Sequence, residues 1–374
     1  MSGLHLDSLD IDNFRCFQHL RITRLGRVNL IVGRNSVGKT CLLEALAVYA
    51  NNADPVILQG QLAARNEFVY SGEDLRDLEQ SERLFEQYVL AFGGFFHGRD
   101  SRPGESIASI STVDGLKKVT FGLNFFAAER DEQGQLRSYR VLPKDEYDLA
   151  DDVRIRLSVR RNAGRHQSRA LFAHLKPGQF LTRAEDDINC LFIPSSGFNN
   201  SYMAELWDRI ALTDLEQITI KALRSIDSNI SRYSFLKAPP NRYPIVKHAF
   251  YSAPIPLRIL GHGMIRTLGI SLALVNAKNG ILLIDEFESG LHHTVQTDLW
   301  RLIIQFANQL DIQVFATTHS WDCVEAFQQA SAEDQTEQSL LIRLEKRRDA
   351  AGIEAVLYDK RRMEIATREG IEVR

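Results

Sequence analysis

Eight consecutive residues of this 374-residue chain have the types and spacing needed to hold the phosphate groups of a nucleotide. Residues 33–40 read GRNSVGKT and match the pattern G-x-x-x-x-G-K-[ST]. Glycines let backbone N–H groups turn inward around phosphates, and the amino end of a following helix adds partial positive charge. We expect Lys39 to neutralise the β- and γ-phosphates and the Thr40 hydroxyl to be a ligand of Mg²⁺. The residues predicted to hold ATP in this loop are Gly33, Asn35, Ser36, Gly38, Lys39, Thr40 and Cys41.

Two adjacent acids, Asp285 and Glu286, follow the apolar run 281–284. Ligands bind at the carboxyl ends of strands in open α/β sheets, so the acids stand where a metal-nucleotide would lie. We expect Asp285 to belong to the Mg²⁺ shell and Glu286 to orient and polarise the attacking water. The alternative is that the acids merely end a strand, and the phosphate loop in the same chain makes that the weaker interpretation.

A histidine follows the next predicted strand. Residues 313–317 (QVFAT) read as a further strand, and His319 comes two residues later, 34 residues after Asp285. At the end of a neighbouring strand, an imidazole can donate a hydrogen bond to the γ-phosphate and so sense it. Lone histidines are more often structural, but this position favours a catalytic role for His319.

Two glycines, Gly261 and Gly263, precede an apolar run with helical spacing. A turn of this kind exposes the N–H groups of a helix start toward an anion. Two spaced glycines are a weak signal, because close packing between helices requires the same residues.

The elements that carry these residues form an α/β pattern. The apolar strand 28–32 leads into the phosphate loop, and a helix follows from Lys39. The final third alternates a helix near 264–277, strand 281–284, a helix near 295–309 and strand 313–317. Such alternation predicts a parallel sheet, and the fold class is that of a P-loop NTPase.

We divide the chain into five parts of a single head, residues 1–374. The periodicity of apolar residues changes from one part to the next, and residues 51–104 include a helix starting near Glu73. The parts are N-terminal strands and phosphate loop in 1–50, a helical insertion in 51–104, an antiparallel β region in 105–195, a helical region in 196–250, and the half with the glycine turn, acids and histidine in 251–374.

Composition excludes several classes of protein. The net charge of −3 provides no general attraction to nucleic acid, so DNA contact needs a local patch. No apolar run reaches the roughly 18–20 residues that span a bilayer, and the first residues do not resemble a signal peptide, so we expect a cytoplasmic protein without a membrane partner. The four cysteines form no C-x-x-C pair, which argues against a zinc site or a disulfide framework.

The order of these motifs resembles the ABC-type ATPase heads of the SMC and RecF kind, and more closely the OLD-like predicted ATPases. The resemblance is strong over about 1–50 and 251–374. It rests on the segments DNFRCF (12–17), LGHGM (260–264), LIDEFESGLH (283–292) and FATTHS (315–320).

That resemblance implies a homodimer or higher homo-oligomer in which two heads clasp two ATP molecules. Gly261 and Gly263 would then contact the nucleotide held by the other chain, Arg15 would lie near the nucleotide, and residues 290–292 would form a loop at the interface. The chain departs from the pattern at His262, where the group has an acid, and at Gly261, where transporter-type heads have serine. No glutamine occurs in 192–200, where a metal-sensing glutamine is expected. The Toprim nuclease domain of OLD nucleases is not expected in the roughly 55 residues after His319.

The leading hypothesis is an ATP-dependent switch in bacterial anti-phage defence, coupled to a separately encoded nuclease or toxin effector. A RecF-like DNA-binding ATPase is the alternative, since a predicted sheet carries many basic residues that suit phosphate backbones. A transporter subunit and a standalone nuclease fit the motifs less well. The basic residues are Arg154, Arg156, Arg160, Arg161, Arg165, Arg169 and Lys176.

Overall fold

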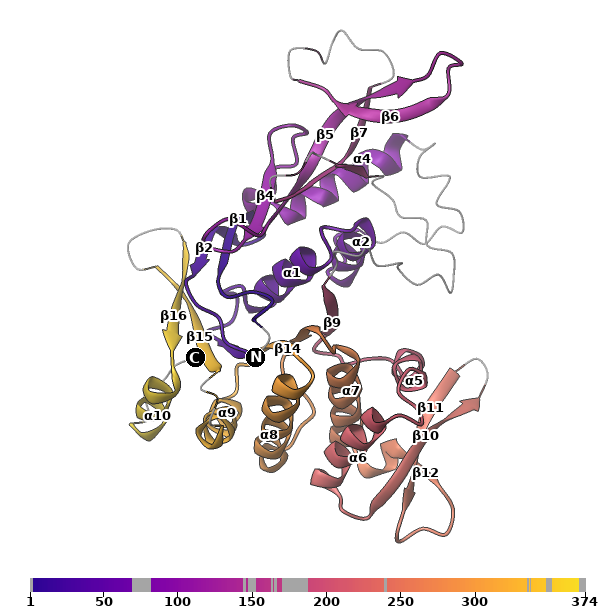
Figure 1. The fold of residues 1–374 in the computed structure, drawn as a ribbon, viewed down its shortest axis with the longest axis vertical. Helices are drawn as coiled ribbons and strands as arrows, with labels where there is room; N and C mark the ends of the chain where they lie inside the picture. The colour runs from indigo at the N-terminus through magenta and orange to yellow at the C-terminus, as the bar shows by residue number, and fades with distance from the viewer. Residues whose placement is uncertain are drawn as a thin grey trace.

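A six-stranded mixed sheet forms the core of the computed structural model (Figure 1). Its strands are β3 (Val28–Val32), β9 (Asn189–Ile193), β13 (Gly280–Ile284), β14 (Ile312–Thr317), β15 (Ser339–Lys346) and β16 (Ile353–Tyr358). The order is β16-β15-β3-β14-β13-β9, in which only the pairing of β16 with β15 is antiparallel. The predicted α/β P-loop NTPase class with a mixed core sheet is confirmed. Because β14 lies between β3 and β13, the chain segments that follow these three strands meet at one edge.

The structure describes residues 3–369 with several gaps. The residues left out of that range are 69–81, 144–145, 147–152, 163, 165–166, 170–187, 239–240, 335, 337 and 348–351. The predicted helix start near Glu73, and the basic residues Arg165 and Lys176, lie outside the described residues. Among the described helices, none is long and apolar enough to cross a bilayer.

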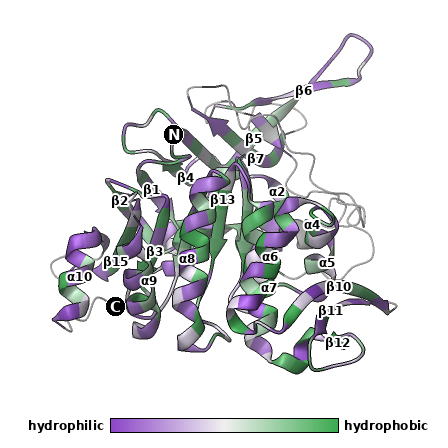
Figure 2. Cartoon of the chain, turned by 60° about the horizontal axis from the view of Figure 1, so that its bottom comes forward, coloured by the Kyte–Doolittle hydropathy of each residue, from purple (hydrophilic) through white to green (hydrophobic). Residues whose placement is uncertain are grey.

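Helices and a second sheet cover the two faces of the core sheet. On one face pack α7 (His262–Asn276), α8 (His293–Gln309) and α9 (Trp321–Glu333), and on the other α1 (Lys39–Ala50). Successive strand residues point to opposite faces, so Leu282 and Ile284 contact the α7 side while Ile281 and Leu283 contact the α1 side. Figure 2 shows the resulting concentration of hydrophobic residues around β13. A sheet buried on both faces holds the ends of its strands firmly in place.

The second sheet is antiparallel and packs over α1. Its strands are β1 (Leu9–Phe14), β2 (Phe17–Ile22), β4 (Ile107–Ser111), β5 (Lys118–Arg130), β6 (Leu136–Val141), β7 (Val153–Arg161) and β8 (Gln167–Arg169). The order is β2-β1-β4-β5-β7-β8, with β6 paired to β5. The rings of Phe14 and Phe121, from this sheet, contact those of Phe92 and Phe95, mostly edge to face. The antiparallel region that the sequence predicts is therefore present, and the N-terminal hairpin β1–β2 belongs to it.

One predicted boundary differs from the structure. The sequence places residues 189–193 in the antiparallel region, but β9 pairs parallel with β13 because its apolar residues complete the core sheet. The helical insertion already has a helix at its start, because α2 (Pro55–Ala64) begins with the Asp54 side chain accepting a hydrogen bond from the Val56 N–H and with Pro55 in the first turn. The insertion continues with α4 (Glu82–Phe92) and two 3₁₀ turns, η1 (Gly93–Phe95) and η2 (His97–Arg99).

The predicted helical region 196–250 is helical only in its first half. It contains α5 (Asn200–Asp208) and α6 (Asp214–Ile226), and then β10 (Ile230–Ala238), β11 (Asn241–His248) and β12 (Ile255–Pro256) form a small antiparallel sheet. Pro244 does not break β11. It pairs with Phe235 of β10, and because β12 pairs only with Ile245 and Val246, residue 244 has no strand partner on its other side. A 3₁₀ turn, η4 (Leu257–Leu260), then leads to α7, and α10 (Lys360–Arg368) ends the described chain.

Candidate nucleotide-binding site

The phosphate loop lies between β3 and α1, as the sequence predicts. Gly33 has φ 146° and Gly38 has φ 92°, values that L side chains rarely adopt. A Cβ atom would lie 2.4 Å from the Leu344 carbonyl oxygen at position 33 and 2.6 Å from Cys16 Sγ at position 38. Both glycines are therefore required by the backbone conformation and by the space around it.

A hollow of about 320 Å³ opens beside this loop. It is lined by Asn35, Ser36, Gly38, Lys39, Thr40, Cys41, Arg65, Asp285, Glu286, Thr317 and His319. Residues from the ends of β3, β13 and β14 thus meet in one place, which the strand order of the core sheet explains. The structure brings the predicted acids and histidine together with the phosphate loop.

Lys39 lies across this loop. Its ammonium group donates hydrogen bonds to the carbonyl oxygens of Gly33, at 2.7 Å, and Arg34, at 3.2 Å. Burial lowers the pKa of Lys39 from its ordinary value, and the carboxylates of Asp285, Glu288 and Glu286 oppose that shift. A half-buried ammonium among acids is suited to exchange its carbonyl partners for the phosphate oxygens of a metal-nucleotide.

Asp285 is held by two hydroxyl groups. The Thr40 hydroxyl donates to Asp285 Oδ2 at 3.1 Å, and the Thr317 hydroxyl donates to Asp285 Oδ1 at 2.6 Å. Thr317 also accepts a hydrogen bond from the Glu286 N–H at 2.9 Å, so one hydroxyl fixes both acids. Thr317 is not among the predicted site residues. It is the last residue of a strand that follows the acidic strand in the α/β pattern, and that position could have identified it as a site residue. Thr40 and Asp285 supply the hydroxyl and carboxylate oxygens that Mg²⁺ prefers.

Glu286 has a left-handed backbone conformation, with φ 46°. A residue other than glycine in this region costs about 1–3 kcal/mol, and such strain collects at functional sites. The Glu286 N–H is bound by Thr317, and its carbonyl oxygen accepts from Arg266 at 3.0 Å. Backbone contacts on both sides therefore turn the Glu286 side chain into the hollow.

Arg266 connects three segments of the site and is not among the predicted residues. Its side chain, from α7, donates to the carbonyl oxygens of Pro194 at 2.9 Å, Asp285 at 2.8 Å and Glu286 at 3.0 Å. The residue is only 7% exposed. Burial lowers the pKa of its guanidinium, and the carboxylates of Asp285, Glu288 and Glu286 oppose that shift. Arg266 thus ties the glycine-led helix to the ends of β9 and β13.

Replacing Arg266 with Met is expected to destabilise the protein by about 3 kcal/mol, because the carbonyl oxygens of buried Asp285 and of half-buried Pro194 and Glu286 lose their donor. Thermal unfolding followed by circular dichroism measures the effect. Arg258→Met, at an exposed position in η4, is the matched control and is expected to unfold at the wild-type temperature. Equal melting temperatures for the two variants would contradict this role.

Glu288 holds His319. The His319 backbone N–H donates to Glu288 Oε1 at 3.1 Å, and the ring Nδ1 lies 3.3 Å from the same oxygen. Glu288 is 12% exposed at its side chain, whereas His319 is 54% exposed. The carboxylate therefore orients an accessible imidazole at the edge of the hollow. The sequence shows Glu288 only as part of the segment 283–292, and a carboxylate that follows the acidic strand so closely is the signal that could have assigned it this role.

Glu288→Gln is expected to lower ATP turnover about three- to tenfold, because the acceptor that holds His319 loses its negative charge while the fold stays intact. Steady-state phosphate release measures the rate. Glu325→Gln changes a carboxylate that accepts a hydrogen bond from Trp321 on the exposed side of α9, and it should turn over at the wild-type rate. Wild-type turnover in Glu288→Gln would show that the orientation of His319 is unimportant.

Gly261 and Gly263 do not line the phosphate-loop hollow. Gly261 has φ 104° and begins α7 without a side-chain cap, and it is exposed. A Cβ at Gly263 would lie 3.1 Å from the Gly290 carbonyl oxygen, so this glycine permits a close backbone approach. The amino end of α7 instead borders a separate hollow of about 140 Å³, which His262, Ser289 and Gly290 help to line.

The expectation that Arg15 lies at the nucleotide is not supported. Its guanidinium is 2.8 Å from Glu44 Oε2, 2.6 Å from Glu67 Oε2 and 4.7 Å from the centre of the Phe95 ring. A charged side chain that is only 3% exposed needs such partners, and these fix it behind α1. The arginine that lines the hollow is Arg65, which pairs with the same Glu44 at 2.7 Å.

Cys41 follows Thr40 and contacts both a thiol and a guanidinium. A hydrogen bond from the Cys16 thiol lowers the pKa of Cys41 to about 7, against the opposing effect of burial and with help from Arg65. The same hydrogen bond and burial raise the pKa of Cys16. Arg65 donates to Cys41 Sγ at 3.3 Å. Cys41 therefore carries the more acidic thiol of the pair.

The basic residues of β7 fall on two faces of the antiparallel sheet. Arg154, Arg156 and Arg160 share one face, as the period of two predicts, and Arg156 stacks 3.9 Å from the Tyr139 ring centre. Arg161 is one residue out of phase, and Arg169 lies 3.5 Å from Asp54. The predicted basic residues therefore do not all lie on one common surface.

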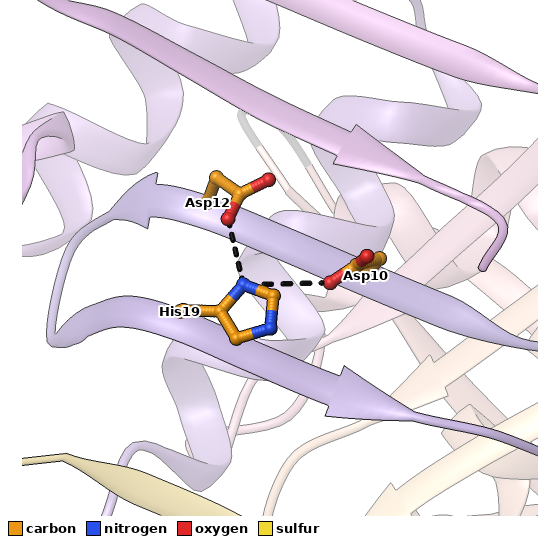
Figure 3. Close-up of side chains that lie close together, drawn as sticks. All are labelled: Asp10, Asp12 and His19. Atoms are coloured by element: carbon orange, nitrogen blue, oxygen red, sulfur yellow. Dashed lines mark hydrogen bonds and ion pairs between the residues drawn. The ribbon is translucent and has the colours of Figure 1, made fainter. Parts of the chain in front are cut away.

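A second group of titratable residues lies on the β1–β2 hairpin and does not line the phosphate-loop hollow. Figure 3 shows His19 facing Asp10 and Asp12, with its Nδ1 2.7 Å from Asp12 Oδ1 and 3.6 Å from Asp10 Oδ1. Asp12 and His19 are cross-strand partners, and Asp10 lies on the same face of β1. Side chains of His19 and Asp12 are about half exposed. The imidazole and the Asp12 carboxylate form a hydrogen bond across the two strands, whereas Asp10 Oδ1, 3.6 Å from the ring, has no hydrogen-bond partner among the described residues.

Two known proteins have sequences similar to this chain. Over 350 residues the chain is 24% identical to an ATP/GTP phosphatase of Helicobacter pylori, covering 88% of this chain and 89% of that protein. An uncharacterized protein of Methanocaldococcus jannaschii is 39% identical over 44 residues, which is 12% of this chain and 20% of that protein.

Solved structures of SMC heads align along nearly the whole chain. An Smc head bound to the C-winged helix domain of ScpA aligns with a TM-score of 0.47 and 11% identity over 97% of this chain and 99% of that chain. The SMC head domain from Thermotoga maritima aligns with a TM-score of 0.44 and 13% identity over 95% of this chain and all of that chain.

A family model matches residues 28–322, from β3 to the start of α9. This range includes the phosphate loop, Asp285, Glu286 and His319. The chain therefore belongs to the family described as "AAA domain, putative AbiEii toxin, Type IV TA system", and it is an ATPase.

Proposed function

We propose that this ATPase works as a dimer of heads, and that ATP binding and hydrolysis switch a partner effector. One observation carries the proposal. The phosphate loop, Asp285, Glu286 and His319 converge on one hollow, while the uncapped amino end of α7 lies outside it. A single chain thus holds the catalytic groups and leaves an anion-binding helix end for another chain.

Each residue of the hollow has a proposed role. Lys39 and the loop N–H groups bind the phosphates, and Thr40 and Asp285 hold Mg²⁺. Glu286 orients and polarises the attacking water, and His319 contacts the γ-phosphate. The donor set fits this metal, because Thr40 and Asp285 already point their oxygen atoms toward each other at 3.1 Å.

The dimer is proposed from the position of Gly261. This residue is exposed, begins α7 with a positive φ, and no atom lies within 4 Å of its Cβ position. No acidic residue occupies the first turn of α7, so the N–H groups at this end attract a phosphate without competition from the chain itself. ATP held in the hollow of one chain would be completed by α7 of the partner.

The effector is proposed to be a separately encoded nuclease or toxin, in bacterial anti-phage defence. Membership of a family described by an AbiEii toxin and a type IV toxin–antitoxin system supports a toxin-linked role. The resemblance of segments 12–17, 260–264 and 283–292 to OLD-like ATPases supports the same class. ATP is the proposed nucleotide, and the relative named as an ATP/GTP phosphatase makes GTP the competitor to test.

The experiment compares two variants in the presence of ATP and Mg²⁺. Glu286→Gln should sediment as a dimer and retain its partner through purification from its own host, and Lys39→Ala should do neither. A partner retained equally by both variants would contradict an ATP-controlled switch. Monomeric Glu286→Gln with ATP bound would contradict the dimer.

A DNA-binding ATPase is the second candidate, favoured by Arg154, Arg156 and Arg160 on one face of β7. Removing one arginine that binds a DNA phosphate should reduce the slope of log affinity against log salt by about one. Replacing all three arginines with Ala should then weaken binding to duplex DNA and lower the slope by about three. Wild-type protein that binds no DNA at low salt would eliminate this candidate.

A further inference from the structure

The outer face of the β1–β2 hairpin carries a histidine and two aspartates that have no part in the nucleotide site (Figure 3). Asp12 and His19 are cross-strand partners, and Asp10 precedes Asp12 by two residues, so the three side chains leave the same face of two paired strands. The apolar residues that alternate with them along both strands are buried in the core. The three side chains therefore start from backbone that the buried face of the sheet holds in place.

Three possible ligand atoms converge on this face. His19 Nδ1 lies 2.7 Å from Asp12 Oδ1 and 3.6 Å from Asp10 Oδ1, and the three atoms all lie within 4.8 Å of one another. A zinc ion at about 2.0–2.2 Å from each of three such atoms requires them to be about 3.0–3.5 Å apart. The two distances from the imidazole bracket that range, so small side-chain rotations bring the atoms to it.

The carboxylate of Asp10 has an unsatisfied oxygen atom. Its side chain is 19% exposed, yet the Oδ1 atom is buried and has no hydrogen-bond partner among the described residues. Arg21 stands opposite Asp10 on β2, but it is exposed and forms no ion pair with this carboxylate in the described part of the chain. A buried carboxylate oxygen without a donor costs free energy, and a bound cation removes that cost. This atom therefore points to a ligand independently of the spacing of the three residues.

Asp12 is oriented from its other side by β4. Ser109 is the cross-strand partner of Asp12 on that strand, is 7% exposed, and its hydroxyl donates to Asp12 Oδ2 at 3.3 Å. The second oxygen, Oδ1, faces the imidazole of His19. Outer hydrogen bonds of this kind hold the ligands of a metal in orientation. Because the side chains of Asp12 and His19 are about half exposed, a hydrated cation can reach them from solvent.

We propose that Asp10, Asp12 and His19 form a zinc site that joins β1 to β2. Imidazole nitrogen and carboxylate oxygen are donors that Zn²⁺ takes in proteins, and a water molecule would complete four ligands. The imidazole disfavours Mg²⁺ and Ca²⁺, which prefer oxygen ligands. The cysteine spacing in the sequence argues against zinc held by thiolates, and this set of donors contains no thiolate.

The proposed site lies close to the turn of the hairpin that touches the phosphate loop. Arg15 and Cys16 form this turn between β1 and β2. A Cβ atom at Gly38 would lie 2.6 Å from Cys16 Sγ, so the turn packs directly on the loop. A cation that joins the two strands steadies the segment that makes this contact. The inference does not rest on the proposed function, because zinc binding here needs neither ATP nor a second chain.

The test uses tag-free protein that has been stripped of metal with a chelator and then freed of the chelator, without nucleotide or Mg²⁺. Isothermal titration with zinc chloride should show one ion bound per chain, and a zinc excess should raise the melting temperature by about 2–5 °C. His19→Ala and Asp10→Asn should each weaken zinc binding by about 100-fold or more, and Ser109→Ala by about tenfold. Melting temperatures of the metal-free variants check that they fold.

Two control variants test other places where zinc could bind. His293→Ala removes an exposed imidazole that lies beside His292 at the start of α8, and Asp285→Asn removes a carboxylate of the nucleotide hollow. Both variants should bind zinc as the wild type does. X-ray absorption at the zinc edge should show nitrogen and oxygen ligands at about 2.0–2.2 Å and no sulfur at about 2.3 Å.

A wild-type protein that binds no zinc, zinc binding that survives His19→Ala, or a sulfur ligand would overturn the proposal. Zinc that is lost in Asp285→Asn and kept in Asp10→Asn would overturn it as well, because the ion would then lie in the nucleotide hollow. A head that stays monomeric with ATP but binds zinc through the three hairpin residues would contradict the proposed function and leave this inference standing.

Discussion

Glu286→Gln is expected to lower ATP turnover by about 10²–10⁴-fold, the usual contribution of a positioned general base. The amide keeps the size of the side chain and the backbone contacts that Thr317 and Arg266 make to residue 286, so the geometry of the hollow is retained. ATP affinity should therefore remain near that of the wild type. Phosphate release and equilibrium nucleotide binding measure the two quantities separately.

Glu364→Gln, on the exposed side of α10, is the matched control and should hydrolyse ATP at the wild-type rate. Wild-type turnover in Glu286→Gln would remove this residue from the mechanism. A parallel loss of turnover and affinity would instead show that Glu286 acts mainly in binding.

Lys39→Ala is expected to weaken ATP binding by about 100-fold, because charge-assisted hydrogen bonds worth about 3 kcal/mol are removed. The carbonyl oxygens of Gly33 and Arg34 also lose their donor, but Arg34 is exposed and water replaces the ammonium there. Turnover should fall to background for lack of bound nucleotide. Isothermal titration with ATP and Mg²⁺ measures the affinity.

The control is Lys278→Ala, which removes an exposed lysine between α7 and β13. It should bind ATP as the wild type does. Wild-type affinity in Lys39→Ala would contradict the assignment of residues 33–40 as the nucleotide-binding loop.

The phosphate loop and the acidic pair could be predicted because the residues that form each of them are consecutive in the sequence. The strand before each motif is a short apolar run, and the carboxyl ends of parallel strands meet at one edge. The structure confirms that β3, β13 and β14 deliver Lys39, Asp285 and His319 to the same hollow. The roles assigned to these residues stay predictions.

The supporting residues could not be predicted in the same way. Arg266 and Thr317 act through backbone and hydroxyl contacts between segments that are 72 and 32 residues apart, and no local pattern specifies such pairs. Arg15, in contrast, was predicted to be a site residue, and the structure does not support that expectation. Its motif suggests a nucleotide contact, but burial behind α1 requires carboxylate partners, and Glu44 and Glu67 provide them.

The β10–β11 hairpin is wrongly predicted as helix because local signals there conflict. Helical spacing up to Ile226 is genuine, and α6 ends there. Prolines at positions 239, 240 and 244 suggest a break in the chain, yet Pro244 occupies a position of β11 that has no partner on one side. Whether a strand can contain a proline at this point depends on which of its sides has a neighbouring strand. The sequence pattern does not show this.

The central claim, that α7 of one chain completes the nucleotide site of another, is tested most directly by mixing two inactive variants. Lys39→Ala disables the phosphate loop, and Gly261→Glu places a carboxylate at the amino end of α7, where no atom of the same chain lies within 4 Å of the added Cβ. The positive φ at 261 adds a local strain of about 1–3 kcal/mol, so melting temperatures are compared first.

Each variant alone should hydrolyse ATP at background rate. In an equal mixture, half of the dimers contain one copy of each, and one of their two sites has neither lesion, so turnover should recover to about a quarter of the wild-type rate. A mixture that stays at background, or a Gly261→Glu variant that is fully active alone, would contradict a site shared between two chains.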